Sequence, residues 1–223
     1  MTIISHTHKF VFFKPRKVGG SSLLVAFGQH CRHPDVVTAP GNTEGFLRNA
    51  MNCTGIPTHT YPEKIKAIME PSDWKSYKKI TCVRNPWDVA ISMLFWKIYR
   101  EHKQGIIFSD TARNAILNGT IDPKNEELRE QMQIICDGLP RNNDFYLDQR
   151  QQPWADVFIR YEAIQSDYDK ACDLVGLPRS ELPRLKGKAR PQEQDYRIFY
   201  DDALRDLVYE KCATTIDYFD YKF

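Results

Sequence analysis

Near the N-terminus, a short apolar strand, a pair of glycines and the start of a helix follow one another directly. Lys9–Phe13 (KFVFF) is apolar and rich in β-forming residues, and Pro15 closes it, which predicts a buried strand. Gly19 and Gly20 follow in the turn, and Ser21–Gln29 places serines at the N-cap position before a run of helix formers. A strand that passes through glycines straight into a helix predicts an α/β fold, because the helix then packs back onto the sheet.

Strand and helix patterns continue to alternate along the 223 residues, and no internal repeat is present. This alternation predicts a single α/β domain with a central, mainly parallel sheet flanked by helices. The further predicted strands are Lys79–Val83 and Trp154–Tyr161; the predicted helices are Pro62–Met69, Pro86 to about His102, Glu126–Ile135, an amphipathic segment ending at Val175, and Asp202–Phe219; Asp35–Asn52 is predicted to be a loop.

The formal net charge of +2 conceals three strongly basic segments. Residues 1–34, 74–104 and 183–190 carry net charges of +5, +5 and +4, which leaves −12 for the rest of the chain. Nucleic-acid-binding proteins are more often basic overall, whereas separate basic segments in an acidic chain fit convergence on one small anionic ligand. Chance clustering of solvated lysines explains the same count. We therefore expect no nucleic-acid partner, and charge alone does not decide between the other two explanations.

The cysteines and the N-terminal segment indicate the expected compartment. Six cysteines are scattered without a C-x-x-C pair, which favours neither a disulfide framework nor a zinc site. The N-terminus lacks the pattern of a signal peptide, and no apolar stretch approaches the ~20 residues that span a bilayer. We expect a cytoplasmic protein with reduced thiols, no metal and no transmembrane segment.

The glycine turn is predicted to bind an anion. Gly19 and Gly20 allow backbone amides to approach a ligand closely, and the helix that follows presents unbonded N–H groups. Ser21 and Ser22 add hydroxyl donors. The alternative is that the glycines only form a tight turn, which a serine caps. Cations directly after the strand favour a phosphate or sulfate site: Lys14, Arg16 and Lys17.

The order of residues in this turn differs from that of a P-loop nucleotide-binding protein. In G-x-x-x-x-G-K-[ST] the lysine follows the glycines, and an acidic residue on a neighbouring strand helps to hold the metal ion. Here Lys17 precedes Gly19, and the strand that ends at Val83 leads into Arg84. A phosphate or sulfate can still bind, but the arrangement for a metal-bound triphosphate is missing.

A second anion-binding pair follows the second predicted strand, in the segment C-V-R-N-P-W-D-V-A-I-S. Ligands of open α/β sheets bind at the carboxyl ends of the strands, where Arg84 stands. Ser92 lies about two turns along the next helix, so a guanidinium and a hydroxyl can share one phosphate. The alternative is that Arg84 pairs with Asp88 and that Ser92 is a packed helix residue.

Together, K-P-R-K-V-G-G-S-S and C-V-R-N-P-W-D-V-A-I-S resemble the two cofactor signatures of sulfotransferases that use 3′-phosphoadenosine 5′-phosphosulfate (PAPS). The similarity points to the small carbohydrate-type enzymes related to heparan sulfate 2-O-sulfotransferase. His59–Ile65 (HTYPEKI), Val157–Glu162 (VFIRYE) and the terminal Tyr218–Phe223 (YFDYKF) also resemble segments of that family, so the resemblance covers nearly the whole chain.

The resemblance implies one sulfotransferase domain over residues 1–223 with a P-loop-like three-layer fold. It implies a phosphosulfate loop at 14–22, a 3′-phosphate segment at 84–92 and a nucleotide cover at 183–190. Lys17 would reach the bridging oxygen of the phosphosulfate. The implied cofactor-binding residues are Lys14, Arg16, Lys17, Gly19, Gly20, Ser21 and Ser22 in the loop, Arg84 and Ser92 at the 3′-phosphate, and Lys186 and Lys188 in the cover.

Sulfuryl transfer to an alcohol requires a base for the acceptor proton and positive charge at the leaving phosphate. A histidine with an ordinary pKa of ~6.5 suits the first task, and a lysine suits the second. His59 lies just before the helix that starts at Pro62, and the resemblance implies that it is the general base, with Lys17 at the leaving group. The alternatives are a surface role for His59, and Glu63 as its orienting group or replacement.

The sequence therefore predicts a PAPS-dependent sulfotransferase that acts by in-line transfer to a hydroxyl of an acceptor, a glycan or glycoconjugate. The product of the cofactor is 3′-phosphoadenosine 5′-phosphate (PAP). Two other functions remain open: a P-loop-type nucleotide kinase or hydrolase, and a non-catalytic module that binds glycan or sulfate. The sequence indicates neither the acceptor nor the oligomeric state.

Overall fold

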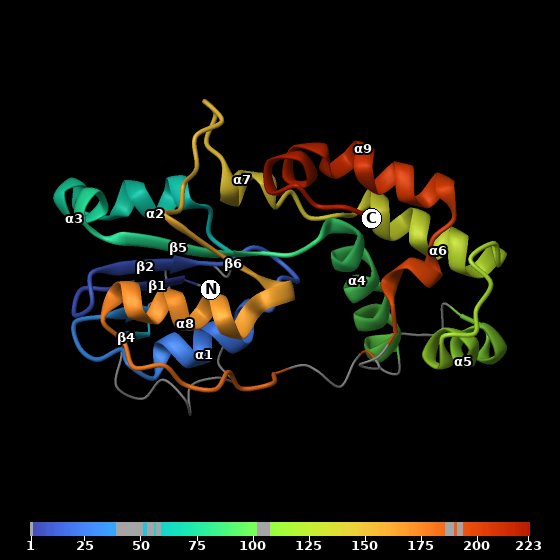
Figure 1. The fold of residues 1–223 in the computed structure, drawn as a ribbon, viewed down its shortest axis with the longest axis horizontal. Coiled ribbons are helices and arrows are strands. Elements are labelled where there is room, and N and C mark those ends of the chain that lie inside the picture. Colours follow the sequence, from blue (N-terminus) through green and yellow to red (C-terminus); the bar gives the residue numbers. More distant parts are fainter. Residues whose placement is uncertain are drawn as a thin grey trace. The chain divides into compact units, whose positions relative to one another are not determined.

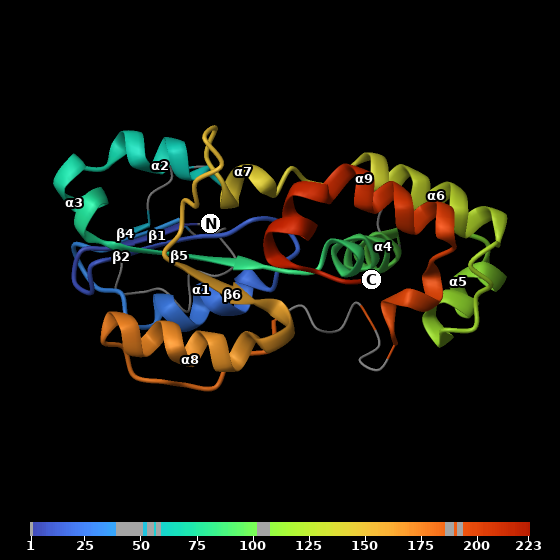
Figure 2. The same ribbon diagram turned by 45° about the horizontal axis from the view of Figure 1, so that its top comes forward.

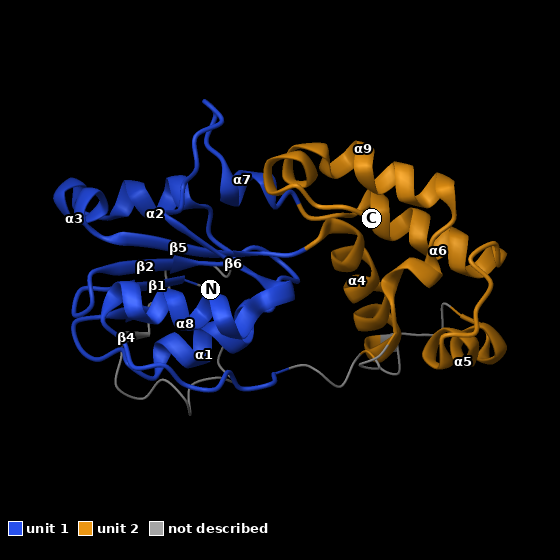
Figure 3. Ribbon diagram, viewed as in Figure 1, with its two compact units in different colours: residues 1–84, 141–185 blue, residues 85–140, 186–223 orange. Residues whose placement is uncertain are grey.

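The computed structural model describes residues 2–38, 51–52, 56, 59–101, 108–185, 190 and 194–223. The chain folds into two compact units, and each is built from two segments of the sequence (Figure 3). Unit 1 comprises Met1–Arg84 and Arg141–Leu185, and unit 2 comprises Asn85–Pro140 and Lys186–Phe223. The α/β layers lie in unit 1, whereas the described part of unit 2 is helical.

The sheet of unit 1 has six strands: β1 Thr2–Ser5, β2 Phe10–Phe13, β3 Val36–Val37, β4 Met51–Asn52, β5 Lys78–Val83 and β6 Val157–Arg160. Their order is β4-β3-β1-β2-β5-β6. β2, β5 and β6 run parallel, as do β3 and β4, but β1 is antiparallel to both of its neighbours. The sheet is thus mixed rather than mainly parallel as predicted, because β1 and β2 form a hairpin and a short connection of this kind reverses the chain.

Three strands were not predicted from the sequence. β3 and β4 fall within the segment 35–52 that was predicted to be a loop, and each has only two residues, too few to show a period of two. β1 is buried at every position, so it shows no alternation of polar and apolar residues. Short strands and strands buried on both faces leave little pattern in a sequence.

Helices cover both faces of this sheet. Figures 1 and 2 show α1 and α8 on one face and α2 and α3 on the other. Unit 1 is therefore an α/β unit in which helices flank the sheet, as the alternating pattern predicts. The helices of unit 1 are α1 Gly20–Gly28, α2 Pro62–Ile68, α3 Pro71–Ser76, α7 Asn143–Tyr146 and α8 Ile164–Val175, which a 3₁₀ turn at Tyr161–Ala163 precedes.

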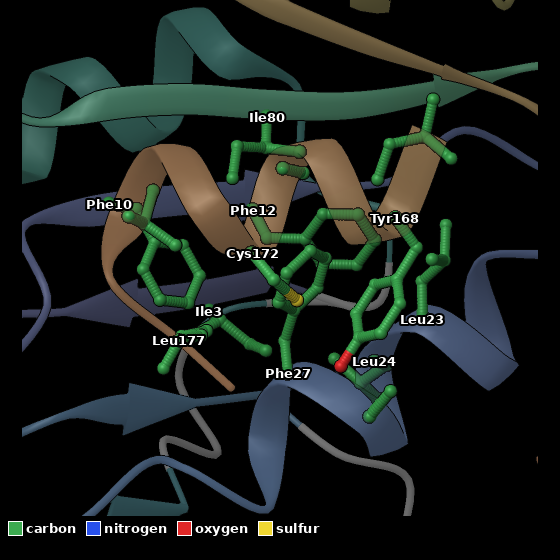
Figure 4. Close-up of a cluster of buried hydrophobic side chains, with 14 of the residues drawn as sticks. Ile3, Phe10, Phe12, Leu23, Leu24, Phe27, Ile80, Tyr168, Cys172 and Leu177 are labelled. Carbon is green, nitrogen blue, oxygen red and sulfur yellow. The ribbon is translucent and has the colours of Figure 1, made fainter. Parts of the chain in front are cut away.

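Aromatic side chains fill the core between the sheet and helices α1 and α8 (Figure 4). The ring of Phe27 in α1 lies 5.5 Å from Phe10, 5.3 Å from Phe12 and 5.1 Å from Tyr168 of α8, measured between ring centroids. Such tilted pairs add to the free energy gained by burying the rings. Cys172 belongs to the same cluster. This packing holds α1 on the sheet and so fixes where the glycine turn begins and ends.

The thiols of the described cysteines agree with the role of small apolar residues. All five are free, and four of them are buried. Burial raises the pKa of the Cys82 thiol to about 12, so it stays protonated at neutral pH. Cys53 lies outside the described residues.

Unit 2 contains the helices α4 Pro86–Glu101, α5 Asp110–Asn118, α6 Glu126–Asp137 and α9 Asp202–Phe219, together with a 3₁₀ turn at Tyr196–Phe199. α4, α6 and α9 pack against one another. The ring of the C-terminal Phe223 lies 5.5 Å from Trp87 and 5.4 Å from Tyr200 between centroids. α5 was not predicted from the sequence. Among the described residues, no helix has both the length and the apolar character needed to cross a membrane.

Candidate functional site

Three neighbouring parallel strands of unit 1 end at the same edge of the sheet, and the candidate residues follow them. The glycine turn follows β2, Arg84 follows β5, and Tyr161 follows β6. The guanidinium of Arg84 donates from Nη1 to the Lys17 carbonyl at 3.2 Å, and its Cζ lies 3.8 Å from the centroid of the Tyr161 ring. The structure thus brings Arg84 and the glycine turn together, as the strand order predicts.

Side chains from three separate segments hold carbonyl groups of the turn. His59 Nδ1 donates to the Lys14 carbonyl at 3.0 Å, Asn142 Nδ2 donates to the Arg16 carbonyl at 3.1 Å, and Arg84 holds the Lys17 carbonyl. A carbonyl group that accepts such a hydrogen bond cannot turn its partially negative oxygen toward a bound anion. The conformation of the turn therefore depends on residues far away in the sequence.

His59 is a neutral histidine whose tautomer is determined by its partner. A carbonyl oxygen only accepts hydrogen bonds, so Nδ1 carries the proton and Nε2 carries the lone pair of the neutral ring. Burial lowers the pKa of His59 to about 4; the bond to the Lys14 carbonyl opposes this, and the nearby charges of Lys14 and Arg16 lower the pKa further. At neutral pH the ring is thus able to accept a proton at Nε2.

Lys14 is almost completely buried, although it is a lysine. The residue is 5% exposed, and its Nζ donates to the Ser21 hydroxyl at 3.3 Å. Gly20 provides the room for this side chain, because a Cβ added there would lie 2.5 Å from Lys14 Cδ. The absence of a side chain at Gly20 therefore allows a cation to pack inside the turn.

Gly19 is required both by its backbone and by its neighbours. Its φ of 76° lies in the left-handed region that favours glycine, and a Cβ there would lie 2.8 Å from Cδ2 of Tyr161. The tight-turn explanation for the two glycines thus holds in part, since backbone conformation and packing require them. The predicted serine cap is wrong, because Gly19 is the N-cap of α1 and no side chain caps the helix there. The tight turn leaves the anion-binding explanation intact, because the backbone amides and cations of the turn are still present.

Two residues without this freedom adopt the same left-handed conformation at the site. Both Lys17 and His59 have a φ of 63°. This conformation is unfavourable for residues with a Cβ, and such strain concentrates at functional sites where the surrounding structure enforces it. The two residues assigned to catalysis by the resemblance are thus both held in strained backbone conformations.

The predicted nucleotide cover at 183–190 is described only in part. At its start, the Leu185 amide donates to the Ser22 hydroxyl at 3.3 Å, so this end of the segment lies against the glycine turn within unit 1. Lys186 and Lys188 lie outside the described residues. Arg190, in unit 2, forms an ion pair with Asp88 and donates from Nη2 to the Gln194 carbonyl at 2.6 Å.

The predicted 3′-phosphate pair is divided between the two units. Arg84 ends the first segment of unit 1, and Ser92 is a partly buried residue of α4 in unit 2. Asp88, the alternative partner that the sequence suggests for Arg84, is paired with Arg190. The joint role of Arg84 and Ser92 stays a prediction.

Sequence reasoning missed two residues that shape the site, Asn142 and Tyr161. Tyr161 is the last residue of the predicted strand Trp154–Tyr161 and directly follows β6 in the structure, so its place at the end of a third strand was available as a signal. Asn142 carries no signal in the sequence, because it meets Arg16 across 126 residues and only the fold brings them together. Among the described residues, no group of three or more histidine, cysteine or acidic side chains is suited to hold a metal ion.

The chain was compared with known proteins as a further test of the site. Neither the comparison with protein-family models nor the comparison with curated proteins found a match. The residues and their geometry therefore carry the functional argument alone.

Proposed function

We propose that this protein is a sulfotransferase that moves the sulfuryl group of PAPS to a hydroxyl of a carbohydrate acceptor, on a P-loop-like fold. The observation that carries the proposal is the bond between His59 Nδ1 and the Lys14 carbonyl. It ties a neutral histidine, with its lone pair on Nε2, to the same short turn that holds the cations and the glycines. A base and an anion-binding turn in direct contact are the two parts that sulfuryl transfer requires.

The residues of the turn fit the anionic groups of PAPS. The buried Lys14 cation, the Lys17 ammonium and the first amides of α1 suit the 5′-phosphosulfate, since helix N-termini favour anions. Arg84, at the end of the adjacent strand, suits the 3′-phosphate. When bound, PAPS supplies a sulfuryl group on a phosphate leaving group.

The chain's own residues then have distinct tasks. His59 Nε2 accepts the proton of the acceptor hydroxyl, and its bond to the Lys14 carbonyl keeps the ring in the required tautomer. The Lys17 ammonium stabilises the negative charge that develops at the leaving group. Lys14 and Ser21 hold the anion in place.

Two measurements on the purified protein test the proposal. Calorimetry with PAP should show binding, and labelled PAPS should transfer its sulfuryl group to members of a glycan panel. His59→Asn is the informative variant, because asparagine tolerates a positive φ and can still donate to the Lys14 carbonyl. We expect loss of transfer by at least ~10²-fold, as for the removal of a general base, with PAP affinity retained.

The matched control is His8→Asn, which changes a histidine on the β1–β2 turn. A second test variant is Arg84→Ala, which should weaken PAP binding. Near-normal turnover of His59→Asn would remove His59 from the mechanism, and unchanged PAP affinity of Arg84→Ala would remove the 3′-phosphate assignment. PAP or glycan binding without any transfer by the wild-type protein would support the non-catalytic module instead.

A further inference from the structure

We propose that Asn142 is a positioning residue that holds Lys17 in its left-handed conformation. Its effect on catalysis rests on the proposed function, whereas its effect on the backbone does not. Asn142 makes two hydrogen bonds to one residue of the turn: Arg16 N–H donates to Asn142 Oδ1 at 3.2 Å, and Asn142 Nδ2 donates to the Arg16 carbonyl at 3.1 Å. A side-chain amide thus pairs with the backbone as a neighbouring strand would.

This pairing acts directly on Lys17. The Arg16 carbonyl belongs to the same planar peptide group as the Lys17 N–H, so holding that carbonyl sets the orientation of the plane before Lys17. Arg84 Nη1 holds the Lys17 carbonyl, which belongs to the plane after it. Both planes that define the backbone angles of Lys17 are therefore fixed by side chains.

The hydrogen bonds from Asn142 are needed because the backbone conformation of Lys17 is unfavourable. Lys17 has a φ of 63°, where the Cβ of an L-residue crowds the following carbonyl. Without Asn142, the residue can relax to a right-handed or extended conformation, and this would redirect its side chain. Backbone strain of this kind persists only where the surroundings over-determine it.

Asn142 is itself anchored by its surroundings. Its carbonyl accepts from Phe145 N–H at 2.9 Å, and Phe145 is 3% exposed. The Phe145 ring lies 4.6 Å from the Tyr61 ring between centroids, and Tyr61 stands two residues after His59. The short segment 142–145 thus supports both the Lys17 side and the His59 side of the site.

The first test needs no cofactor. In Asn142→Ala we expect faster hydrogen exchange at the Arg16 amide and a change in the backbone chemical shifts of Lys17, which report on its φ. Asp144→Ala is the matched control and should change neither, because Asp144 is an exposed residue of α7, the helix that Asn142 directly precedes. Asn142→Asp is a second variant that keeps the acceptor for Arg16 N–H and loses the donor. Lys17 shifts equal to wild type in both Asn142 variants would overturn the proposal.

The second test measures the catalytic consequence. We expect Asn142→Ala to lower kcat by roughly 10- to 100-fold, as for a small misplacement of a catalytic group, while the Kd for PAP changes less than about 3-fold. In a Lys17→Ala background the same substitution should have no further effect on kcat. An additional loss in that background would contradict action through Lys17. Failure of the wild-type protein to bind PAP would instead overturn the proposed function, and the first test would still decide the role of Asn142.

Discussion

At the scale of single residues, the environment of His59 decides what chemistry the site can support. A histidine with an ordinary pKa would be partly protonated near neutrality, but burial lowers the pKa of His59 to about 4. A lower pKa makes the ring a weaker base, and it also keeps the ring in the base form at all physiological pH values. The acid limb of a kcat/KM profile that reports on His59 is thus expected near pH 4 rather than near 6.5.

The same pKa predicts a pH dependence of folding stability that does not depend on any activity. Between pH 6.5 and about 4 the unfolded chain binds a proton at His59 and the folded chain does not. The free energy of unfolding therefore falls as the pH is lowered through this window. Urea unfolding at a series of pH values measures the effect, and His59→Asn should show a shallower dependence than the wild-type protein.

The difference in pH dependence between the wild-type protein and His59→Asn reports on His59 alone. Burial also lowers the pKa of His30, but this residue titrates in both proteins and its effect cancels. Parallel curves for wild type and His59→Asn would show that the pKa of His59 is not lowered by folding. That result would also weaken its assignment as a base that is always deprotonated.

At the scale of elements, the connection from β2 to α1 depends on the space that its two glycines leave for neighbouring side chains. Gly19 adopts a left-handed φ against the Tyr161 ring, and Gly20 leaves space for the Lys14 side chain. The sequence indicates a turn here, but it does not say which residues fill the space beside it. Tyr161 follows β6, and it reaches the turn only because β2, β5 and β6 are neighbours in the sheet.

Two alanine substitutions separate backbone strain from steric contact. Gly176, at the end of α8, has a φ of 69° and nothing within 4 Å of an added Cβ, so Gly176→Ala should cost only the strain of the left-handed region, about 1 kcal/mol. Gly19→Ala adds the contact with Tyr161 and should cost about 2–4 kcal/mol in the free energy of unfolding. Chemical denaturation of both variants measures the difference, and equal costs would mean that the Tyr161 ring and the Ile164 side chain, which lies 2.9 Å from the added Cβ, both move freely.

At the scale of the whole molecule, basic and acidic residues nearly balance, yet three segments carry a net charge of +14 and the rest of the chain carries −12. The first of them contains Lys14 and Lys17, and the second contains Arg84. In the third, Arg190 is neutralised by Asp88, so this segment contributes less positive charge than its composition suggests. In the second segment, Lys79 Nζ lies 3.2 Å from Asp156 Oδ2 and over the Trp74 ring, so this lysine is paired and not simply solvated.

With the proposed function, this distribution predicts that transfer from PAPS does not depend on a divalent metal ion. Lysine and arginine side chains supply the positive charge that the phosphates require, and Arg84 stands where a P-loop protein would carry a metal-binding acid. EDTA should leave the rate of transfer from labelled PAPS unchanged within about 2-fold of the untreated protein, well below the ~10²-fold loss expected from removing the base. The control is a parallel assay with ATP and Mg²⁺, in which hydrolysis or phosphoryl transfer would favour the nucleotide-kinase or hydrolase alternative.

Local patterns in the sequence were sufficient to predict most of the helices and strands of the fold. The predicted helices starting at Pro62 and Pro86 and the helix Asp202–Phe219 agree with the structure within a few residues, because proline at a helix start and apolar periodicity act over short distances. The strands Phe10–Phe13 and Lys78–Val83 were equally visible. β1 and the two-residue strands were not predicted, because a strand buried at every position and strands of two residues show no alternation of polar and apolar residues.

The sequence by itself determined that a strand, two glycines and a helix would form a cationic turn, since each of these preferences is local. Only the tertiary structure decided which side chains hold that turn. His59, Asn142 and Arg84 reach the carbonyls of Lys14, Arg16 and Lys17 from three distant segments. It also decided the tautomer and the lowered pKa of His59, because desolvation and hydrogen-bond partners arise only when the chain is folded.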